Sequence, residues 1–323
     1  MQKGSQRMGV HLRVYMNHDG GGDDFVALLL LLRMPDVDLT GVSVIGADGY
    51  LEPSTQASRK IIDRFGGAPR EGLDVSRSDS RGKNPFPSAW RIMSYYVDAF
   101  PILNEAESVR TPISDKPAHL HLIDRVRAGE GKTTLVFTGP LTDLARALDE
   151  APDIEDRIDR VVWMGGTFLP KGNVEEPEHD GTAEWNAFWD PEGTARVWAS
   201  GLRIDMVALE STNQVPLTLE ARDAWAKLRK HEAIDFVGQC YALVPPLIFH
   251  ATNSTYYLWD VLTAAYVGKP DLVKVKTVGS IVRTDGVAQG RTELSESGRP
   301  VNLIYDVDRD GFFSYMTELL KQA

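Results

Sequence analysis

The chain has 323 residues, of which 42% are hydrophobic and 25% charged, as in a soluble globular protein with a large core. Its 35 Lys and Arg against 46 Asp and Glu give a net charge of −11, which argues against a DNA- or RNA-binding protein. A single cysteine, Cys240, excludes an internal disulfide and a cysteine-based zinc site, and it is typical of a reducing compartment.

The N-terminal residues and the apolar runs predict a cytoplasmic protein with no membrane partner. The first ten residues lack the apolar core of a signal peptide. The longest uninterrupted apolar run, residues 25–32, is too short to span a membrane. No repeat or linker marks a boundary, so we expect a single domain over residues 1–323, with residues 1–10 as a disordered or tag-derived N-terminus.

Strand-length apolar runs alternate with helix-like segments along the chain. The predicted strands cover residues 12–16, 38–48, the start of 133–148, 160–166, 203–212, 274–282 and 301–307. The predicted helices cover residues 23–34 (amphipathic, with carboxylates in its first turn), 55–67, the end of 133–148, 191–200, 259–267 and 311–322. This alternation predicts an α/β fold with one large, open, mostly parallel central sheet flanked by helices, with a Rossmann-like core.

Polar residues follow several of the predicted strands. Asp19, Asp48, Thr138 and the pair Gly165–Gly166 each stand where an apolar run ends. Ligands of open α/β sheets bind outside the carboxyl ends of the strands. We therefore expect these positions to converge on one crevice.

The segment "NHDGGGDD", residues 17–24, crowds three carboxylates around three glycines. Like charges that close raise one another's pKa, and a bound cation compensates them. The glycines would let Asp19 and Asp24 face one point, and Ca²⁺ accepts six to eight oxygen ligands. No lysine follows, so the segment is not a P-loop. The alternative is that Asp23 or Asp24 only caps the following helix.

Two further segments have competing interpretations. Residues 306–311, "DVDRDG", match half of an EF-hand loop, but the twelfth position is Thr317, so we predict that Asp310 caps the last helix. Residues 181–191, "GTAEWNAFWDP", place Glu184 and Asn186 beside tryptophans, which suits sugar recognition or a loop held by buried rings.

Several of these segments together resemble the nucleoside hydrolase family, which cleaves the N-glycosidic bond of ribonucleosides. The resemblance runs in order over nearly the whole chain, through "NHDGGGDD", "FTGPLTDLA", "VVWMGG", "DGTAEWN" and "WDVLTAAYV". Within the inosine–uridine preferring superfamily, the chain is most similar to the purine-preferring inosine–adenosine–guanosine subgroup. The resemblance also implies a homodimer that binds a nucleoside.

The resemblance implies a Ca²⁺ site and a set of substrate contacts. Ca²⁺ would be held by Asp19, Asp24, the Thr138 carbonyl and Asp260, with Asp19 as the general base that activates water. The ribose-binding set would be Asp23, Asn173, Glu184, Asn186 and Asp260. Trp90 and Trp259 would sandwich the purine, with Trp259 in the place of a histidine acid of other subgroups, and Asp48 would contact the base. From its position alone, Asp260 could instead be an N-cap.

The chain departs from the family pattern at three places. Asn17 replaces the first aspartate of the signature D-x-D-x-x-x-D-D, and Gly21 replaces an asparagine of the purine-preferring subgroup. Residues 250–257 do not match the family, which leaves His250 and Asn253 without roles. These departures leave two alternatives open, namely a hydrolase of a different N-riboside and a non-catalytic nucleoside- or ribose-binding protein.

Overall fold

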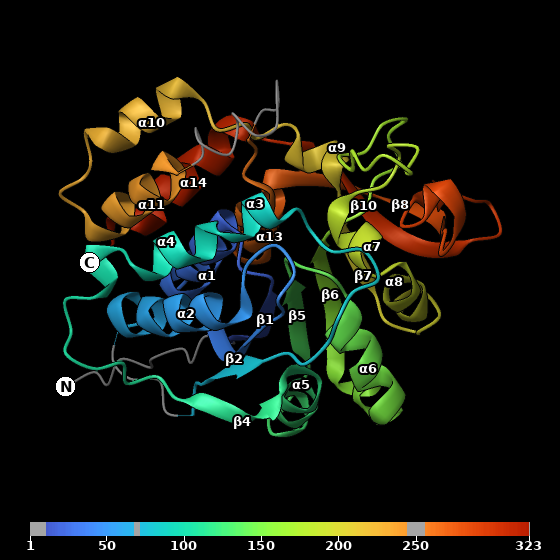
Figure 1. Ribbon diagram of the computed structural model, residues 1–323, viewed down its shortest axis with the longest axis horizontal. Helices are drawn as coiled ribbons and strands as arrows, with labels where there is room; N and C mark the ends of the chain where they lie inside the picture. The colour runs from blue at the N-terminus through green and yellow to red at the C-terminus, as the bar shows by residue number, and fades with distance from the viewer. Residues whose placement is uncertain (1–10, 68–71, 244–255, 323) are drawn as a thin grey trace, which may run out of the picture.

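The computed structural model describes residues 11–67, 72–243 and 256–322 (Figure 1). The expectation for residues 1–10 and the open questions at His250 and Asn253 lie outside the described residues.

Ten strands form one sheet in the order β4-β3-β2-β1-β5-β6-β7-β10-β8-β9. The strands are β1 Leu12–His18, β2 Val37–Val44, β3 Val75–Arg77, β4 Ile113–Pro117, β5 Thr133–Phe137, β6 Ile158–Met164, β7 Ile204–Val207, β8 Val273–Val282, β9 Thr292–Leu294 and β10 Arg299–Val307. The strands from β4 to β10 pair in parallel, whereas β8 and β9 are antiparallel at one edge. The predicted mostly parallel sheet is confirmed.

The strand order reverses between β1 and β5. The chain runs outward from β1 through β2, β3 and β4, and then returns to the other side of β1 with β5, β6 and β7. Such a reversal opens a crevice at the carboxyl ends of the two central strands, where α/β proteins bind their ligands. Asp19 follows β1 and Thr138 follows β5, so both residues stand at this crevice.

Helices cover both faces of the sheet (Figure 1). They are α1 Gly22–Arg33, α2 Leu51–Phe65, α3 Ser88–Arg91, α4 Met93–Asp98, α5 Ala118–Arg127, α6 Thr142–Glu150, α7 Trp185–Trp189, α8 Pro191–Trp198, α9 Leu209–Thr212, α10 Leu219–Ala226, α11 Glu232–Ala242, α13 Trp259–Gly268 and α14 Arg309–Lys321. Because side chains alternate along a strand, Val14 and Met16 of β1 join the core beneath α1 and α13, while Tyr15 joins the core beneath α5 and α6.

The prediction that the first helix is amphipathic is wrong. Every residue of α1 from Gly22 to Leu32 is buried. The reason is a second helical layer, because α13, α11 and α14 pack against α1 on the sides that the sheet leaves open. A helix that is apolar on all sides belongs inside a protein. The crevice is therefore built on two central helices, α1 and α13, that are buried along nearly their whole length.

Three local predictions also need correction. The segment 203–212 is a strand only over β7 and then turns into the short helix α9. Asp308, not Asp310, caps α14, because its Oδ1 accepts the Gly311 N–H at 3.0 Å. Asp260 is not an N-cap, since Leu258 holds that position of α13.

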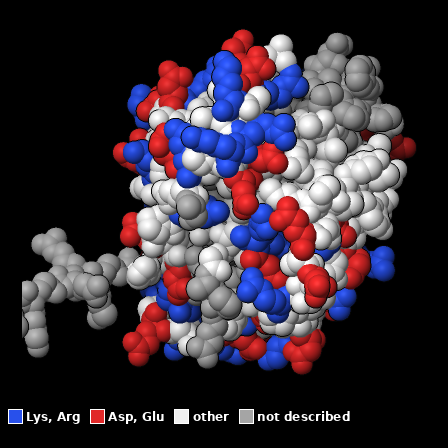
Figure 2. All heavy atoms as spheres, turned by 90° about the vertical axis from the view of Figure 1, so that its left-hand side faces the viewer, with Lys and Arg blue, Asp and Glu red and all other residues white. Residues whose placement is uncertain are grey.

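Charged side chains of both signs are interspersed on the face of the molecule that Figure 2 shows. Nucleic-acid-binding proteins concentrate Lys and Arg on one face, and this face has no such concentration. Among the helices of the described residues, none is both long enough and apolar enough to cross a membrane.

Candidate active site

A cavity of about 570 Å³ opens at the carboxyl ends of β1 and β5. Its lining includes every sequence-predicted site residue except Asp24, namely Asp19, Asp23, Asp48, Trp90, Thr138, Asn173, Glu184, Asn186, Trp259 and Asp260. Asp24 is buried at 1% exposure, below the floor of this cavity. Asp19, Asp48 and Thr138 therefore converge on one crevice as expected, whereas Gly165 and Gly166 do not line it, and the Gly166 N–H instead donates to Glu184.

The glycine-rich turn after β1 brings two carboxylates together. Gly20 has φ of +84°, and a Cβ there would lie 2.1 Å from Ser54 Oγ, so only glycine fits this turn. The side chains of Asp19 and Asp24 then lie close enough that the charge of Asp24 raises the pKa of Asp19. Asp24 also accepts the Gly21 N–H at 2.7 Å and the Thr138 hydroxyl at 2.5 Å. Helix capping thus accounts for one of the hydrogen bonds of the buried Asp24 carboxylate. It does not account for the burial of the Asp19 carboxylate.

Asp23 points away from this turn and reaches α13. Its Oδ2 accepts the backbone N–H of Asp260 at 3.1 Å, and its Oδ1 accepts the hydroxyl of Tyr256 at 2.9 Å. These contacts fix the N-termini of α1 and α13 side by side. Tyr256 lines the cavity, and sequence reasoning missed it. The only signal available was its place three residues before Trp259.

Asn186, in α7, connects the cavity lining to the ends of β5 and β6 by hydrogen bonds. Its Nδ2 donates to the carbonyls of Thr138 at 3.1 Å and Met164 at 3.0 Å. Glu184 caps α7, since its carboxylate accepts the N–H groups of Asn186 at 2.9 Å and Gly166 at 2.8 Å. These two residues are therefore held rigidly at the cavity by backbone hydrogen bonds.

Aromatic rings form the outer part of the cavity. Trp90 meets Trp185 edge to face at 5.3 Å between ring centroids, and Trp185 stacks on Phe86 at 5.0 Å. Trp259, which also lines the cavity, meets Tyr256 edge to face at 4.8 Å between ring centroids. Trp259 Nε1 is buried and has no hydrogen-bond partner in the described part of the chain. The cavity thus combines an acidic floor with aromatic walls, as in a pocket for an amphipathic ring compound.

The acidic floor carries more negative charge than the protein around it balances. Burial and the charges of Asp24 and Asp48 raise the pKa of Asp19 well above its usual range. Burial also raises the pKa of Asp24 to about 7 and that of Asp48 to about 8, although Arg91 lowers the latter. Burial and Asp23 likewise raise the pKa of Asp260. Carboxyls this close ionise together only beside a positive charge.

The donor chemistry of this floor fits Ca²⁺. Asp19, Asp24 and Asp260 offer carboxylate oxygens and Thr138 a backbone carbonyl, and hard cations such as Ca²⁺ prefer oxygen ligands. Among the described residues, no three His, Cys, Asp or Glu side chains already stand in a metal-binding arrangement. Binding would therefore need these carboxylates to turn toward one point, and the attraction between the cation and their charge would offset the repulsion among them.

Comparison with known proteins decides the family. A family model described as inosine-uridine preferring nucleoside hydrolase matches residues 14–314. The chain belongs to the nucleoside hydrolase family. This nucleoside hydrolase is 62% identical in sequence to an inosine-uridine preferring nucleoside hydrolase from Bacillus anthracis whose crystal structure is known. The two structures superpose with a TM-score of 0.91, and the match covers 97% of this chain and 100% of that one. It is a glycosyl hydrolase that cleaves the N-ribosyl bond of nucleosides.

The names of relatives differ in substrate range. This nucleoside hydrolase is 26% identical to the non-specific ribonucleoside hydrolase RihC of Escherichia coli, over 97% of this chain and 100% of the relative. It is 25% identical to the purine-preferring ribonucleoside hydrolase from Gardnerella vaginalis, with a TM-score of 0.79 over 96% of this chain and 100% of that one. Membership in the family therefore leaves the preferred base open.

In this nucleoside hydrolase the position of Asp48 leaves no room for a side chain at Gly21, where the family pattern has an asparagine. A Cβ at Gly21 would lie 2.5 Å from Asp48 Oδ2, closer than real Cβ atoms come to a neighbour. Asp48 occupies the space that a side chain at residue 21 would need. A larger residue at this position would displace the carboxylate that we expect to contact the base.

The contact between Tyr256 and Asp23 yields a testable prediction. Tyr256→Phe removes a hydrogen bond to a buried carboxylate, and such bonds contribute about 1.5–3 kcal/mol. We expect KM for a ribonucleoside to rise about tenfold. Tyr257→Phe is the control, because Tyr257 lines the same cavity without a carboxylate partner in the described residues. Equal KM values for the two variants would remove Tyr256 from substrate positioning.

Proposed function

We propose that the protein is a Ca²⁺-dependent purine nucleosidase that hydrolyses purine ribonucleosides to free base and ribose. The observation that carries this proposal is the pairing of buried carboxylates with the tryptophans Trp90 and Trp259 in the lining of one cavity. The carboxylates suit the polar sugar, whereas the rings suit a flat heterocycle.

In the proposed reaction Asp19 acts as general base. It accepts a proton from the water that attacks C1′ while the C–N bond breaks and its electron pair leaves with the purine. The transition state resembles an oxocarbenium ion, and the surrounding carboxylates stabilise its positive charge. Ca²⁺, when bound by Asp19, Asp24, Asp260 and the Thr138 carbonyl, would supply the charge that orients the water and the ribose diol.

The residues expected around the ribose and the base would orient the substrate. Asp23, Asn173, Glu184, Asn186 and Asp260 are proposed to bind the sugar hydroxyls. Asp23 and Glu184 are pre-oriented by hydrogen bonds of 2.8–3.1 Å. Trp90 and Trp259 are proposed to stack on the purine, so that the ring becomes more basic and takes a proton from solvent. Asp48 is proposed to contact the base.

A panel of kcat/KM values for purine and pyrimidine ribonucleosides tests the proposed preference. We expect higher kcat/KM values for inosine, adenosine and guanosine than for uridine and cytidine. The reason is that the larger purine ring makes more contact area with Trp90 and Trp259. Equal values would point to a non-specific enzyme. Values that favour pyrimidines, or a different N-riboside, would contradict the purine proposal while leaving the glycosyl hydrolase activity intact.

Trp259→Ala tests whether stacking assists bond cleavage. Aromatic stacking contributes about 0.5–1.5 kcal/mol beyond buried area, so we expect kcat for inosine to fall about tenfold. Trp198→Phe is the control, because Trp198 is a buried tryptophan that packs on Trp163 and does not line the cavity. A rise in KM with unchanged kcat would mean that the Trp259 ring only binds the substrate.

The homodimer and the cytoplasmic location stay predictions. Light scattering of the purified protein would test the first, and cell fractionation would test the second.

A further inference from the structure

A buried polar network lies beneath the active site and connects three strand ends. Asn17, in β1, and Asp143, in the first turn of α6, are both 0% exposed. The Asn17 Nδ2 donates to Ser43 Oγ at 2.8 Å and to Asp143 Oδ2 at 3.0 Å. The hydroxyls of Ser78 and Ser80 donate to Asp143 Oδ1 at 2.7 and 2.8 Å.

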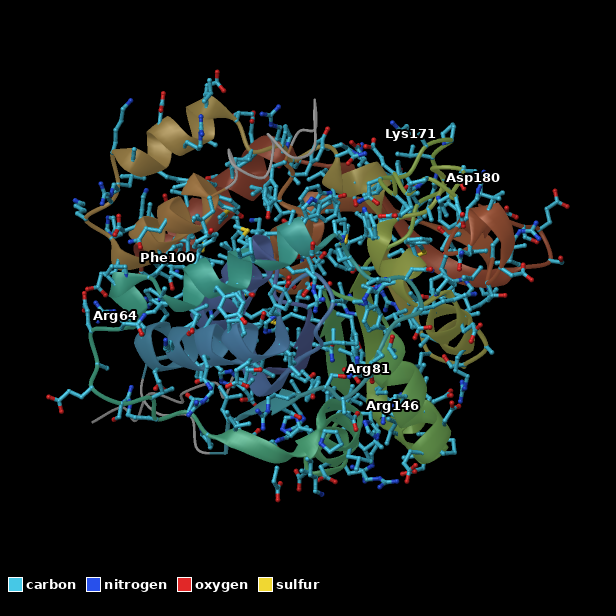
Figure 3. All side chains as sticks on the ribbon, in the orientation of Figure 1. Arg64, Arg81, Phe100, Arg146, Lys171 and Asp180 are labelled. Carbon is cyan, nitrogen blue, oxygen red and sulfur yellow. The ribbon has the colours of Figure 1, made fainter. Side chains whose placement is uncertain are left out.

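All three of these donors to Asp143 are neutral. Arg146, on the next turn of α6 (Figure 3), donates to the Ser80 hydroxyl at 2.7 Å and to Asp79. It therefore reaches the network from outside and does not hydrogen-bond Asp143. Its positive charge acts on Asp143 without a direct hydrogen bond. A second buried carboxylate in contact with Asp143 would repel it, because only neutral groups hydrogen-bond this carboxylate. The environment thus accommodates one carboxylate and one amide.

The network joins the two strands that carry the proposed catalytic groups. Asn17 precedes Asp19 by two residues, and its carbonyl accepts the Thr138 N–H at 3.0 Å. Asp143 lies in the first turn of α6, the helix that follows β5 and Thr138. The side-chain contact between Asn17 and Asp143 therefore spans β1 and β5 at the point where the strand order reverses.

We infer that Asn17 and Asp143 form a positioning pair, in which Asp143 carries the single negative charge that the family signature places at residue 17. The pair fixes the spacing of Asp19 and Thr138 at the cavity floor. It requires one amide and one carboxylate, and the reversed order would keep the serine hydrogen bonds, because serine hydroxyls donate to carboxylate and amide oxygens alike. In the present order Asn17 Oδ1 is buried without a hydrogen-bond partner among the described residues. The inference concerns how the site is held and is independent of the proposed metal and base preference.

Exchange of the two side chains tests this inference. Asn17→Asp alone places two buried carboxylates in contact, and uncompensated buried charge is strongly destabilising, so we expect Tm to fall by roughly 10 °C. We expect kcat to fall as well, with KM less affected, because Asp19 and Thr138 lose their spacing. Asp143→Asn should be milder, since an amide there can turn its oxygen toward Asn17.

The double variant Asn17→Asp/Asp143→Asn should recover both Tm and kcat to near the parent values. Asn302→Asp is the matched control, because Asn302 donates to the buried Asp205 at 2.7 Å, but Arg160 and Arg203 also bind that carboxylate. An added charge there should be tolerated without a second change.

Three outcomes would overturn the inference. The first is an Asn17→Asp variant that matches the parent, and the second is a double variant as impaired as Asn17→Asp. The third is a double variant that recovers Tm but not kcat, because the contact would then support only the fold. All rates are measured well below the Tm of each variant, with whichever ribonucleoside the parent cleaves. Failure of the calcium or purine proposal would leave these comparisons valid.

Discussion

Asp19→Asn is expected to lower kcat by about 10³-fold, because positioned general bases contribute about 10²–10⁴-fold to proton transfer. Asp19 stands at the end of β1 with 3% of its surface exposed, its Oδ2 accepts the Asp48 N–H at 3.4 Å, and the residue lines the cavity. The carboxylate is therefore available to a water in the cavity. Near-normal kcat in this variant would remove Asp19 from the role of base.

The same substitution is expected to preserve or raise Tm in the metal-free protein. Burial, Asp24 and Asp48 all raise the pKa of Asp19, so its charge destabilises the folded state there. An amide of the same shape relieves this repulsion, and active-site residues often trade stability for function in this way. Asp306→Asn is the control, because that carboxylate is exposed and pairs with Lys274. A large loss of Tm in Asp19→Asn would mean that its kcat reports misfolding.

Removal of divalent cations with a chelator is expected to abolish turnover, and added Ca²⁺ is expected to restore it. The carboxyls of Asp19, Asp24 and Asp260 are buried together, and a cation offsets the repulsion that raises their pKa values. Turnover that persists in a chelator at full rate would contradict the calcium proposal.

The substitution Asp24→Asn tests the same calcium proposal by removing one of the proposed ligands. Loss of a metal-ligand carboxylate should raise the Ca²⁺ concentration for half-maximal activity about 100-fold or more, since even outer residues of metal sites change affinity about 10–100-fold. Asp79→Asn is the control, because this exposed carboxylate pairs with Arg146 away from the cavity.

Much of the site was predictable because its residues are local to strand ends. The signature at residues 17–24 joins a strand, a turn and a helix in one segment, so its placement needs no tertiary information. Thr138, Glu184 and Asn186 likewise follow recognisable patterns. Their convergence then follows from the rule that ligands bind at the carboxyl ends of parallel strands.

Other features depend on contacts that no local pattern reveals. Tyr256 and Asp23 are separated by 233 positions, and Asn17 and Asp143 by 126, so only the folded chain brings each pair together. The edge strand β4, "ISDKP", is short and polar and has no apolar alternation. Burial of α1 on all sides depends on α11, α13 and α14, which lie more than 190 residues further along the chain.

Calorimetric titration of Ca²⁺ into chelator-treated protein tests the central claim most directly, with the parent compared to Asp24→Asn/Asp260→Asn. We expect one ion bound per parent chain, a rise in Tm on binding, and neither effect in the double variant. No binding to the parent, or equal binding to both proteins, would contradict it.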